Sequence, residues 1–363
     1  MQTVRPVKIG LASLAAASLL AVAACGGPGA SSSDADVKTD GDAPSSSTSS
    51  LEGPAAEEGK LVWYTSNATP AAEAIGSAFE KKYPEIELEV FQAGGSQVIA
   101  KVEAEAMSGG IKADIVDYSE GAAAVGQAKR GLFQRYLPPS AGDLSPGLVG
   151  ENGFWFSPWY LTSTIVYNTD RISEADAPKS WKELTEPKWK GKVGMASPDY
   201  AGTAVATVGI WQQQFGDDYV NKLGANGLTV FEGFGNVHES VLSGQTPVGI
   251  NLSFRALQAE KDGEPMAWVT PEEGQVLLTF AAAITKNAKH PNAAKLFQNF
   301  LLTDEIQTMA AEDIGYFPGM SEMAEDTGIP DLDKIKKFGA DLDELSDPNF
   351  IAEVKSNFKN ATS

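Results

Sequence analysis

From residue 60 onward, stretches with a strand-like pattern of apolar residues alternate with stretches that have apolar residues at helical spacing. The order of these stretches predicts the fold class. Short apolar runs at residues 61–64 and 113–116 are typical of buried strands. Stretches with apolar residues at helical spacing follow, and the first of them begins at Thr69 and Pro70, which suit a helix start. A second helix is expected after a break at 93–96, and it stops at 108–110. Strands that alternate with helices in this way indicate an α/β fold with a parallel sheet.

The same alternation resumes after an aromatic and proline-rich passage at residues 154–160. A second sheet is predicted from the strand patterns at 164–167, 192–195, 228–230 and 248–250. Residues 277–284 read as one long strand that returns to the first sheet. Two lobes joined by returning strands would place a ligand cleft beyond the carboxyl ends of the strands.

The first 24 residues differ from the rest of the chain. Arg5 and Lys8 precede an uninterrupted run of apolar and small residues that stops before Cys25, the only cysteine. This pattern predicts a secretory signal rather than a membrane-spanning helix. Residues 22–25 resemble the lipobox of bacterial lipoproteins, which implies a diacylated Cys25, and two acyl chains anchor a protein stably. An ordinary signal peptide whose cleavage site contains a cysteine remains the alternative.

Residues 26–58 are rich in Gly, Ser, Ala, Pro and acidic residues, with Val37 and Leu51 as the only large apolar side chains. They are predicted to form a flexible tether, because so few apolar groups cannot offset chain entropy. Seven acidic residues against Lys38 give this segment a charge of −6, and the leader carries +2. The total of −20 therefore leaves −16 on the folded part, which counts against nucleic acid as a partner.

The patterns divide the chain into five parts. We expect a signal peptide at 1–24, a lipidated cysteine and tether at 25–58, an N-terminal lobe at 59–163 plus 276–310, a C-terminal lobe at 164–275, and C-terminal helices at 311–363 that pack on the lobes. The lobes are expected to open and close about the returning strands near 163–166 and 277–281.

Several segments carry a family resemblance from residue 60 to about 320. They lie at 61–66, 113–116, 165–170, 184–194, 241–244 and 291–297. The chain resembles the solute-binding proteins of bacterial ABC importers, in the two-lobed group that binds ferric iron, organophosphates, phosphonates, thiamine and polyamines. The resemblance implies a type II periplasmic-binding-protein clamshell that acts as an exported monomer, captures a small molecule and delivers it to a permease with a separate ATPase. No cofactor is expected.

The ferric members of that group hold iron chiefly through two adjacent tyrosines. The matching positions here are Phe254 and Arg255, and the position of a further histidine ligand falls at about Ala68. Only Glu120 lies near the place of their carboxylate ligand. The departures count against a metal site. A ferric or a cationic ligand stays open as the alternative, and the net charge, Glu120 and Glu232 favour a cation.

Turns with small residues before helices predict an anion site, because helix N-termini present unpaired N–H groups. Arg255 would add a bidentate donor. The leading hypothesis is a phosphate-bearing or phosphonate ligand. The candidate ligand contacts are Ser66, Asn67, Gly95, Ser96, Ser119, Tyr160, Tyr200, Gly202, Thr203, Asn236, Ser253 and Arg255.

Each candidate has a plainer interpretation. Gly-Ser and Gly-Thr at helix starts also act as simple caps, aromatic residues beside strands usually pack in the core, and Arg255 would also suit a surface ion pair. An exported hydrolase is the alternative from another class. The chain has no Gly-x-Ser-x-Gly or His-Glu-x-x-His motif, and neither His238 nor His290 stands in a motif. An enzyme is therefore not expected.

Overall fold

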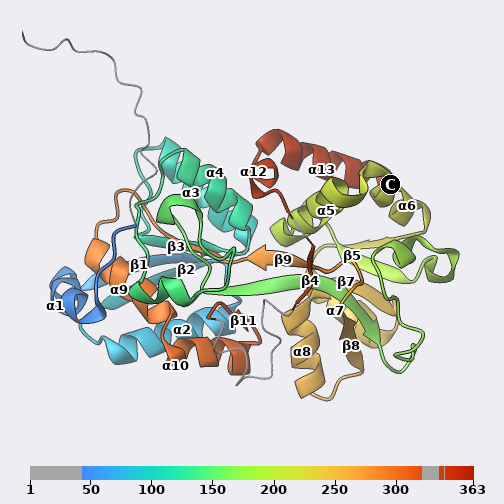
Figure 1. The fold of residues 1–363 in the computed structure, drawn as a ribbon, viewed down its shortest axis with the longest axis horizontal. Coiled ribbons are helices and arrows are strands. Elements are labelled where there is room, and N and C mark those ends of the chain that lie inside the picture. Colours follow the sequence, from blue (N-terminus) through green and yellow to red (C-terminus); the bar gives the residue numbers. More distant parts are fainter. Residues whose placement is uncertain (1–42, 321–334, 339) are drawn as a thin grey trace, which may run out of the picture. The chain divides into compact units, whose positions relative to one another are not determined.

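The computed structural model describes residues 43–320, 335–338 and 340–363. The predicted signal peptide and Cys25 lie outside these residues, so their prediction stands untested. The described chain forms two β-sheets flanked by helices (Figure 1). Within the described residues, no helix has both the length and the apolar character needed to cross a membrane.

The first sheet has the strand order β10-β3-β1-β2. Strands β1 (Lys60–Thr65), β2 (Glu87–Gln92) and β3 (Ile115–Tyr118) are parallel, as predicted, and β10 (Ala281–Ile284) runs antiparallel to β3. Helix α2 (Thr69–Lys82) joins β1 to β2, and α3 (Gly95–Met107) joins β2 to β3. These connections follow from the alternation of strand and helix patterns.

Apolar side chains of β1 point alternately to the two faces of this sheet, and helices cover both. Trp63 packs with Phe297 of α9 (Pro291–Leu301), their ring centroids 5.0 Å apart. Val62 belongs to a separate cluster with Val98 and Val102 of α3. Helices α3 and α4 (Gly121–Lys129) lie above the sheet in Figure 1, whereas α2 and α10 (Asp304–Met309) lie below it.

The second sheet has the order β12-β9-β4-β7-β5-β6, and two further strands pair with β4. Strands β5 (Val193–Ala196), β6 (Thr229–Phe231) and β7 (Val248–Leu252) are parallel to one another. The long strand β4 (Trp159–Asn168) runs antiparallel to β7 and β9 (Gln275–Thr279). The remaining strands are β8 (Met266–Val269), β11 (Phe317–Pro318) and β12 (Lys337–Phe338).

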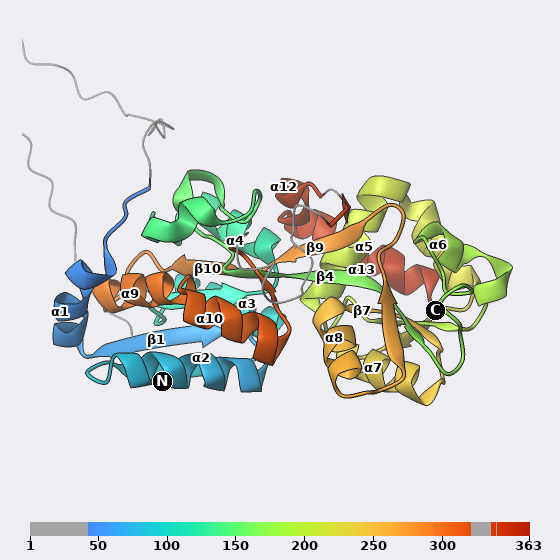
Figure 2. The same ribbon diagram turned by 60° about the horizontal axis from the view of Figure 1, so that its bottom comes forward.

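Helices α5 (Gly202–Phe215), α6 (Asp217–Ala225), α7 (Phe234–Ser243) and α8 (Ser253–Lys261) belong to the second sheet's lobe. The C-terminal α13 (Pro348–Ala361) packs on α5 and α6, and the short α12 (Leu342–Leu345) contacts both α5 and α4. Figure 2 shows α12 above β9 and β4. Shorter turns are η1 (Pro139–Asp143), η2 (Glu151–Gly153), η3 (Lys182–Thr185), η4 (Pro187–Trp189) and η5 (Ala310–Ile314).

Several described chain segments pass between the sheets, and two of them lie side by side. The predicted strand at 277–284 is two strands, β9 in the second sheet and β10 in the first, with only Phe280 between them. The other segment leads into β4, and Phe156 makes an isolated bridge to Ala282 of the first sheet before β4 begins. The predicted return of the chain to the first sheet is therefore confirmed, and the change of sheet falls at Phe280.

The predicted tether requires a correction. Residues 48–58 form a helix, α1 (Thr48–Glu58), which packs on α9 with Leu51 and Ala55 buried. The Glu58 carboxylate accepts hydrogen bonds from the backbone N–H groups of Asn292 (3.0 Å) and Ala293 (2.8 Å), at the start of α9. The end of the acidic segment is thus part of the folded unit, because it fills a hydrophobic site and caps a helix.

Strand β2 differs in part from its predicted pattern. Ile86 is buried and Leu88 is half-buried, but Val90 is 41% exposed. The strand is at the edge of the sheet and pairs only with β1, so its apolar face is incompletely covered.

Candidate functional site

The turn after β1 is held by a buried carboxylate at the end of β3. Asp117 accepts hydrogen bonds from Trp63 Nε1 (2.7 Å), Thr65 Oγ1 and Asn67 Nδ2 (3.2 Å). Burial raises the pKa of Asp117 to about 7 in spite of these donors. Sequence reasoning missed Asp117, which fixes the turn that carries the predicted contacts Ser66 and Asn67.

The predicted contact Asn67 is fully buried, and its Oδ1 has no hydrogen-bond partner among the described residues. Ser66 is half-buried, and its Oγ accepts a hydrogen bond from the Ser119 N–H (3.2 Å). The turn after β1 and the turn after β3 are therefore joined at the carboxyl ends of two neighbouring strands, where α/β sheets place their ligands.

Glu120 lies between the first residues of two helices from different lobes. A Cβ added to Gly95, the first residue of α3, would lie 2.0 Å from Oε2 of Glu120. A Cβ added to Gly202, the first residue of α5, would lie 2.0 Å from Oε1 of the same carboxylate. A side chain at either position would require the Glu120 carboxyl group to shift from its place. The carboxyl group of Glu120 thus lies close to the first residues of both α3 and α5.

The environment of Glu120 affects its ionisation. Ser119 Oγ donates a hydrogen bond to its carboxylate (3.3 Å), but burial dominates and raises the pKa of Glu120 to about 7. A carboxyl group with this pKa changes charge near neutral pH. Its charge state therefore affects whether an anionic or a cationic ligand is favoured beside it.

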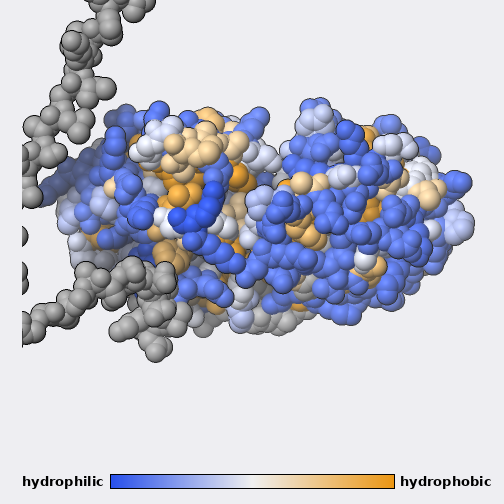
Figure 3. Space-filling view, turned by 90° about the horizontal axis from the view of Figure 1, so that it is seen from above, coloured by the Kyte–Doolittle hydropathy of each residue, from blue (hydrophilic) through white to orange (hydrophobic). Residues whose placement is uncertain are grey.

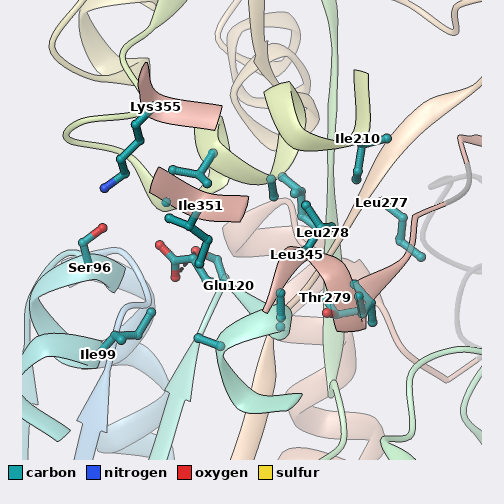
Figure 4. A pocket seen from close by; sticks show the side chains of 18 of the residues that line it. Ser96, Ile99, Glu120, Ile210, Leu277, Leu278, Thr279, Leu345, Ile351 and Lys355 are labelled. Carbon is teal, nitrogen blue, oxygen red and sulfur yellow. Dashed lines mark hydrogen bonds between the residues drawn. The ribbon is translucent and has the colours of Figure 1, made fainter. Parts of the chain in front are cut away.

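A cavity of about 270 Å³ opens beside Glu120, and α3, α4, α5, β9 and the C-terminal helices line it. It is shown in Figure 4. It contains the predicted contacts Ser96, Ser119 and Gly202, which the structure therefore brings together with Glu120. Its volume is near the lower limit of small-molecule sites, so a small ligand fits it best.

Helix α13 contributes a cation to this cavity that sequence reasoning did not anticipate. Lys355 extends its ammonium group from α13 toward the end of the cavity where Ser96 lies (Figure 4). The role of the C-terminal stretch could not be inferred from its helical pattern. The structure makes it a wall of the cavity.

Arg255 lies in a different cavity. This second space, of about 490 Å³, is lined by the start of α2 together with His238, Phe254 and Arg255, and it shares no lining residue with the Glu120 cavity. Arg255 Nε has no hydrogen-bond partner within the described chain, and the guanidinium lies over the Phe254 ring, 5.2 Å from its centroid. Burial lowers the pKa of Arg255. The structure does not place Arg255 beside the α3 and α5 N-termini.

The remaining predicted contacts are scattered. Tyr160 is fully buried and packs edge-on against Phe317, so its ring belongs to the core. Thr203 and Ser253 are also buried, and Ser253 Oγ accepts a hydrogen bond from the Thr162 N–H (3.3 Å). Tyr200 is 67% exposed. Asn236, near the start of α7, is exposed as well.

The described residues contain no group of three or more His, Cys, Asp or Glu side chains placed to hold a metal ion. His290 instead pairs with the buried Asp114, Nδ1 to Oδ2 at 2.7 Å. His238 lies 3.5 Å from the Glu264 carboxylate. The face seen in Figure 3 is mainly hydrophilic with smaller apolar areas, consistent with an acidic protein in contact with water.

The model of the family described as bacterial extracellular solute-binding protein matches residues 74–337. The chain belongs to this family. Three relatives of this chain have names that state a transport role or a ligand. A probable ABC transporter periplasmic-binding protein of Sinorhizobium fredii is 24% identical over 65% of this chain and 68% of its own length. A putative 2-aminoethylphosphonate-binding periplasmic protein of Salmonella typhimurium is 26% identical over 41% of this chain and 47% of its own. The major ferric iron-binding protein of Neisseria meningitidis is 24% identical over 68% of this chain and 77% of its own length.

Solved structures confirm the fold of this solute-binding protein. Iron-bound HitA from Pseudomonas aeruginosa has a TM-score of 0.73 with 22% identity, and covers 84% of this chain and 99% of its own. AfuA from Actinobacillus pleuropneumoniae with fructose-6-phosphate bound has a TM-score of 0.70 with 23% identity, and covers 84% and 98%. The predicted type II two-lobed fold is confirmed. The relatives are transport proteins, so this chain is the solute-binding component of an ABC importer, which works with a ligand, a permease and an ATPase.

Proposed function

We propose that this protein captures a small organic anion with a phosphate or phosphonate group and delivers it to the permease. The observation that carries the proposal is the Glu120 carboxylate against Gly95 and Gly202. The space between the α3 and α5 N-termini holds this carboxyl group, and the oxygen atoms of a ligand headgroup would take its place beside the N–H groups of two helix starts. The 2-aminoethylphosphonate and fructose-6-phosphate names of two similar proteins agree with this chemistry.

The ligand contacts proposed for the headgroup are Gly95, Ser96, Ser119 and Gly202, with Lys355 as the neighbouring cation. A bound headgroup joins both lobes, and it therefore shifts the population toward the closed form. We further propose that Cys25 is lipidated and holds the protein on the outer face of the cytoplasmic membrane. The sequence pattern around Cys25 supports this anchoring.

A cationic solute is the second candidate, because the Glu120 carboxylate in the same cavity offers a partner for an ammonium group. Ferric iron has less support, since Phe254 and Arg255 stand where the ferric members have tyrosines, and an arginine cation repels Fe³⁺.

Thermal stability of the protein against 2-aminoethylphosphonate, fructose 6-phosphate, ferric citrate, thiamine and putrescine tests the proposal. Ligand at 100 times its Kd adds about 2.7 kcal/mol to the free energy of unfolding, which raises Tm by roughly 2 °C or more. The Glu120→Gln variant distinguishes an anionic from a cationic ligand, because the two should change their affinity in opposite directions. It should strengthen binding of an anion, which no longer meets a carboxylate, and weaken binding of a cation. Glu87→Gln, on the exposed face of β2, is the matched control. A stability shift with ferric or cationic ligands only would overturn the anion proposal.

A further inference from the structure

The cavity beside Glu120 is larger and more apolar than a phosphate or phosphonate group requires. We propose that it binds a hydrocarbon portion of the solute, so that the ligand is an amphipathic organophosphonate or organophosphate with an alkyl chain. This inference rests on the proposed function for the headgroup. It adds the class of compound attached to that headgroup.

The apolar walls come from three separate parts of the chain. Helix α5 supplies Val205 and Ile210, strand β9 supplies Leu277 and Leu278, and the C-terminal helix region supplies Leu345 and Ile351. Val205, Ile210, Leu278 and Leu345 are at most 9% exposed, so their side chains are held in place by the core behind them. A wall of this kind is preformed and takes an apolar group without further ordering of the protein.

Charged groups are confined to one end of the cavity. Glu120 and Lys355 lie on the side of Ser96, where Ile99 and Ile351 also lie (Figure 4). Ile210, Leu277 and Leu278 form the uncharged opposite side. Thr279 is a polar residue among the walls, but its Oγ1 lies against Gly121, where an added Cβ would be 1.8 Å away. The hydroxyl therefore lies beside the start of α4, at the edge of the apolar walls. A ligand with one charged end and one apolar end matches this division.

The same division disfavours other ligands of the cavity. A sugar phosphate carries a hydroxyl group on nearly every carbon, and these groups would be buried against leucine and isoleucine side chains without partners. Inorganic phosphate and ferric ion would leave the apolar walls unused. An alkyl chain removes apolar surface from water on both the ligand and the protein, and each buried methylene is expected to lower Kd roughly fourfold.

Calorimetric titration of the protein with methyl-, ethyl-, propyl- and butylphosphonate tests the inference. The Kd is expected to fall roughly fourfold per methylene along the series, because the headgroup is constant and only the chain length changes. Val205→Thr keeps the shape of the wall and adds a hydroxyl, so it should reduce the dependence on chain length. Val90→Thr on β2, at a residue 41% exposed and outside the cavity, is the matched control.

Lys355→Met provides the complementary variant. It should weaken every member of the series by a similar factor, since it acts on the headgroup end, and leave the dependence on chain length unchanged. A Kd that is independent of chain length while methylphosphonate and 2-aminoethylphosphonate still bind would overturn this inference and leave the proposed function standing. Absence of binding for all the phosphonates and for fructose 6-phosphate would overturn both.

Discussion

The hydroxyl of Ser157 accepts a hydrogen bond of 2.6 Å from the backbone N–H of Phe280 and donates one of 2.6 Å to the Trp159 carbonyl. Phe280 is the single residue between β9 and β10, and Ser157 precedes β4. One buried side chain therefore joins two of the segments that pass between the sheets. We expect rotation of one lobe against the other to involve this connection.

Ser157→Ala removes the acceptor and leaves the Phe280 N–H buried without a partner. We expect the free energy of unfolding to fall by about 1–3 kcal/mol, measured by denaturant unfolding. Ser163→Ala in β4 is a matched control, because the Ser163 hydroxyl is buried and has no hydrogen-bond partner in the described structure. Its loss should leave stability unchanged or raise it. Equal effects of the two substitutions would contradict the role assigned to Ser157.

Gly202→Ala places a methyl group where the Glu120 carboxylate lies, 2.0 Å from Oε1. The carboxyl group at the end of this flexible side chain has to shift away from α5, and the added methyl group enters the space proposed for the ligand headgroup between the lobes. We expect weaker ligand binding, measured by calorimetry, with a larger radius of gyration in the presence of ligand by small-angle scattering. Gly94→Ala, next to the start of α3 where nothing lies within 4 Å of the added Cβ, should bind normally. Normal closure of the Gly202 variant would show that the contact with Glu120 is dispensable.

The raised pKa values of Asp117 and Glu120, both about 7, predict a direction for the pH dependence of stability. Each folded-state pKa is above the unfolded value, so the folded protein binds more protons between about pH 4.5 and pH 7. The contribution of these two groups is therefore fully present at low pH and is lost as the pH rises through 7. We expect Tm of the Glu120→Gln variant, relative to the parent, to increase from pH 5 to pH 8.

Titration of Glu120 also predicts the pH dependence of binding. Below about pH 7 the carboxyl group is neutral and does not repel an anionic ligand. The ratio of the parent Kd to the Glu120→Gln Kd should therefore rise with pH, because the titration of the ligand itself cancels in the ratio. The charged neighbour to consider is Lys355, which lines the same cavity. A ratio that does not vary from pH 5.5 to pH 8.5 would contradict this role of Glu120.

Glu58→Ala removes the carboxylate that accepts hydrogen bonds from the first N–H groups of α9. The loss of a helix cap costs about 1–2 kcal/mol of unfolding free energy, and thermal unfolding would show it as a lower Tm. Glu57→Ala on the exposed side of α1 is the control and should have little effect. A chain that begins at residue 59 should lose more stability than either variant, since it also lacks the buried Leu51 and Ala55. Full stability of that shortened chain would restore the interpretation of 48–58 as a tether.

Period and order in the sequence predicted the parallel strands of the first sheet and four strands of the second sheet, but not β8, β11 and β12 or the place of β9 in the second sheet. Strands such as β1 and β7 are continuous apolar runs, and the helices between them have apolar residues at regular spacing. Helix α1 was missed because its segment contains Pro54 and continues an acidic, small-residue composition. Its two buried side chains stabilise the helix only because they pack on α9. Local composition carries no information about a helix that is stabilised by a partner more than two hundred residues away.

The candidate site was predictable only in part. Glycines before helices correctly indicated the α3 and α5 N-termini, but their approach to one carboxylate depends on how two lobes close, which no local pattern records. Arg255 was assigned to the same site because its guanidinium is a bidentate donor that suits an oxyanion, and the structure places it in another cavity. Lys355 lies on a helix whose outer face reads as ordinary solvated surface, so its place in the cavity could not be foreseen.

The hydrogen bonds of Asp117 also affect how much of the site must become ordered when a ligand binds. Its carboxylate already fixes Trp63, Thr65 and Asn67, so the turn after β1 is shaped during folding rather than during capture. The conformational entropy of that turn is lost when the protein folds, so ligand binding does not include this entropy loss. Fast uptake from dilute surroundings would benefit from such a site, since each productive encounter needs only the approach of the lobes and not the search of a loop for its conformation.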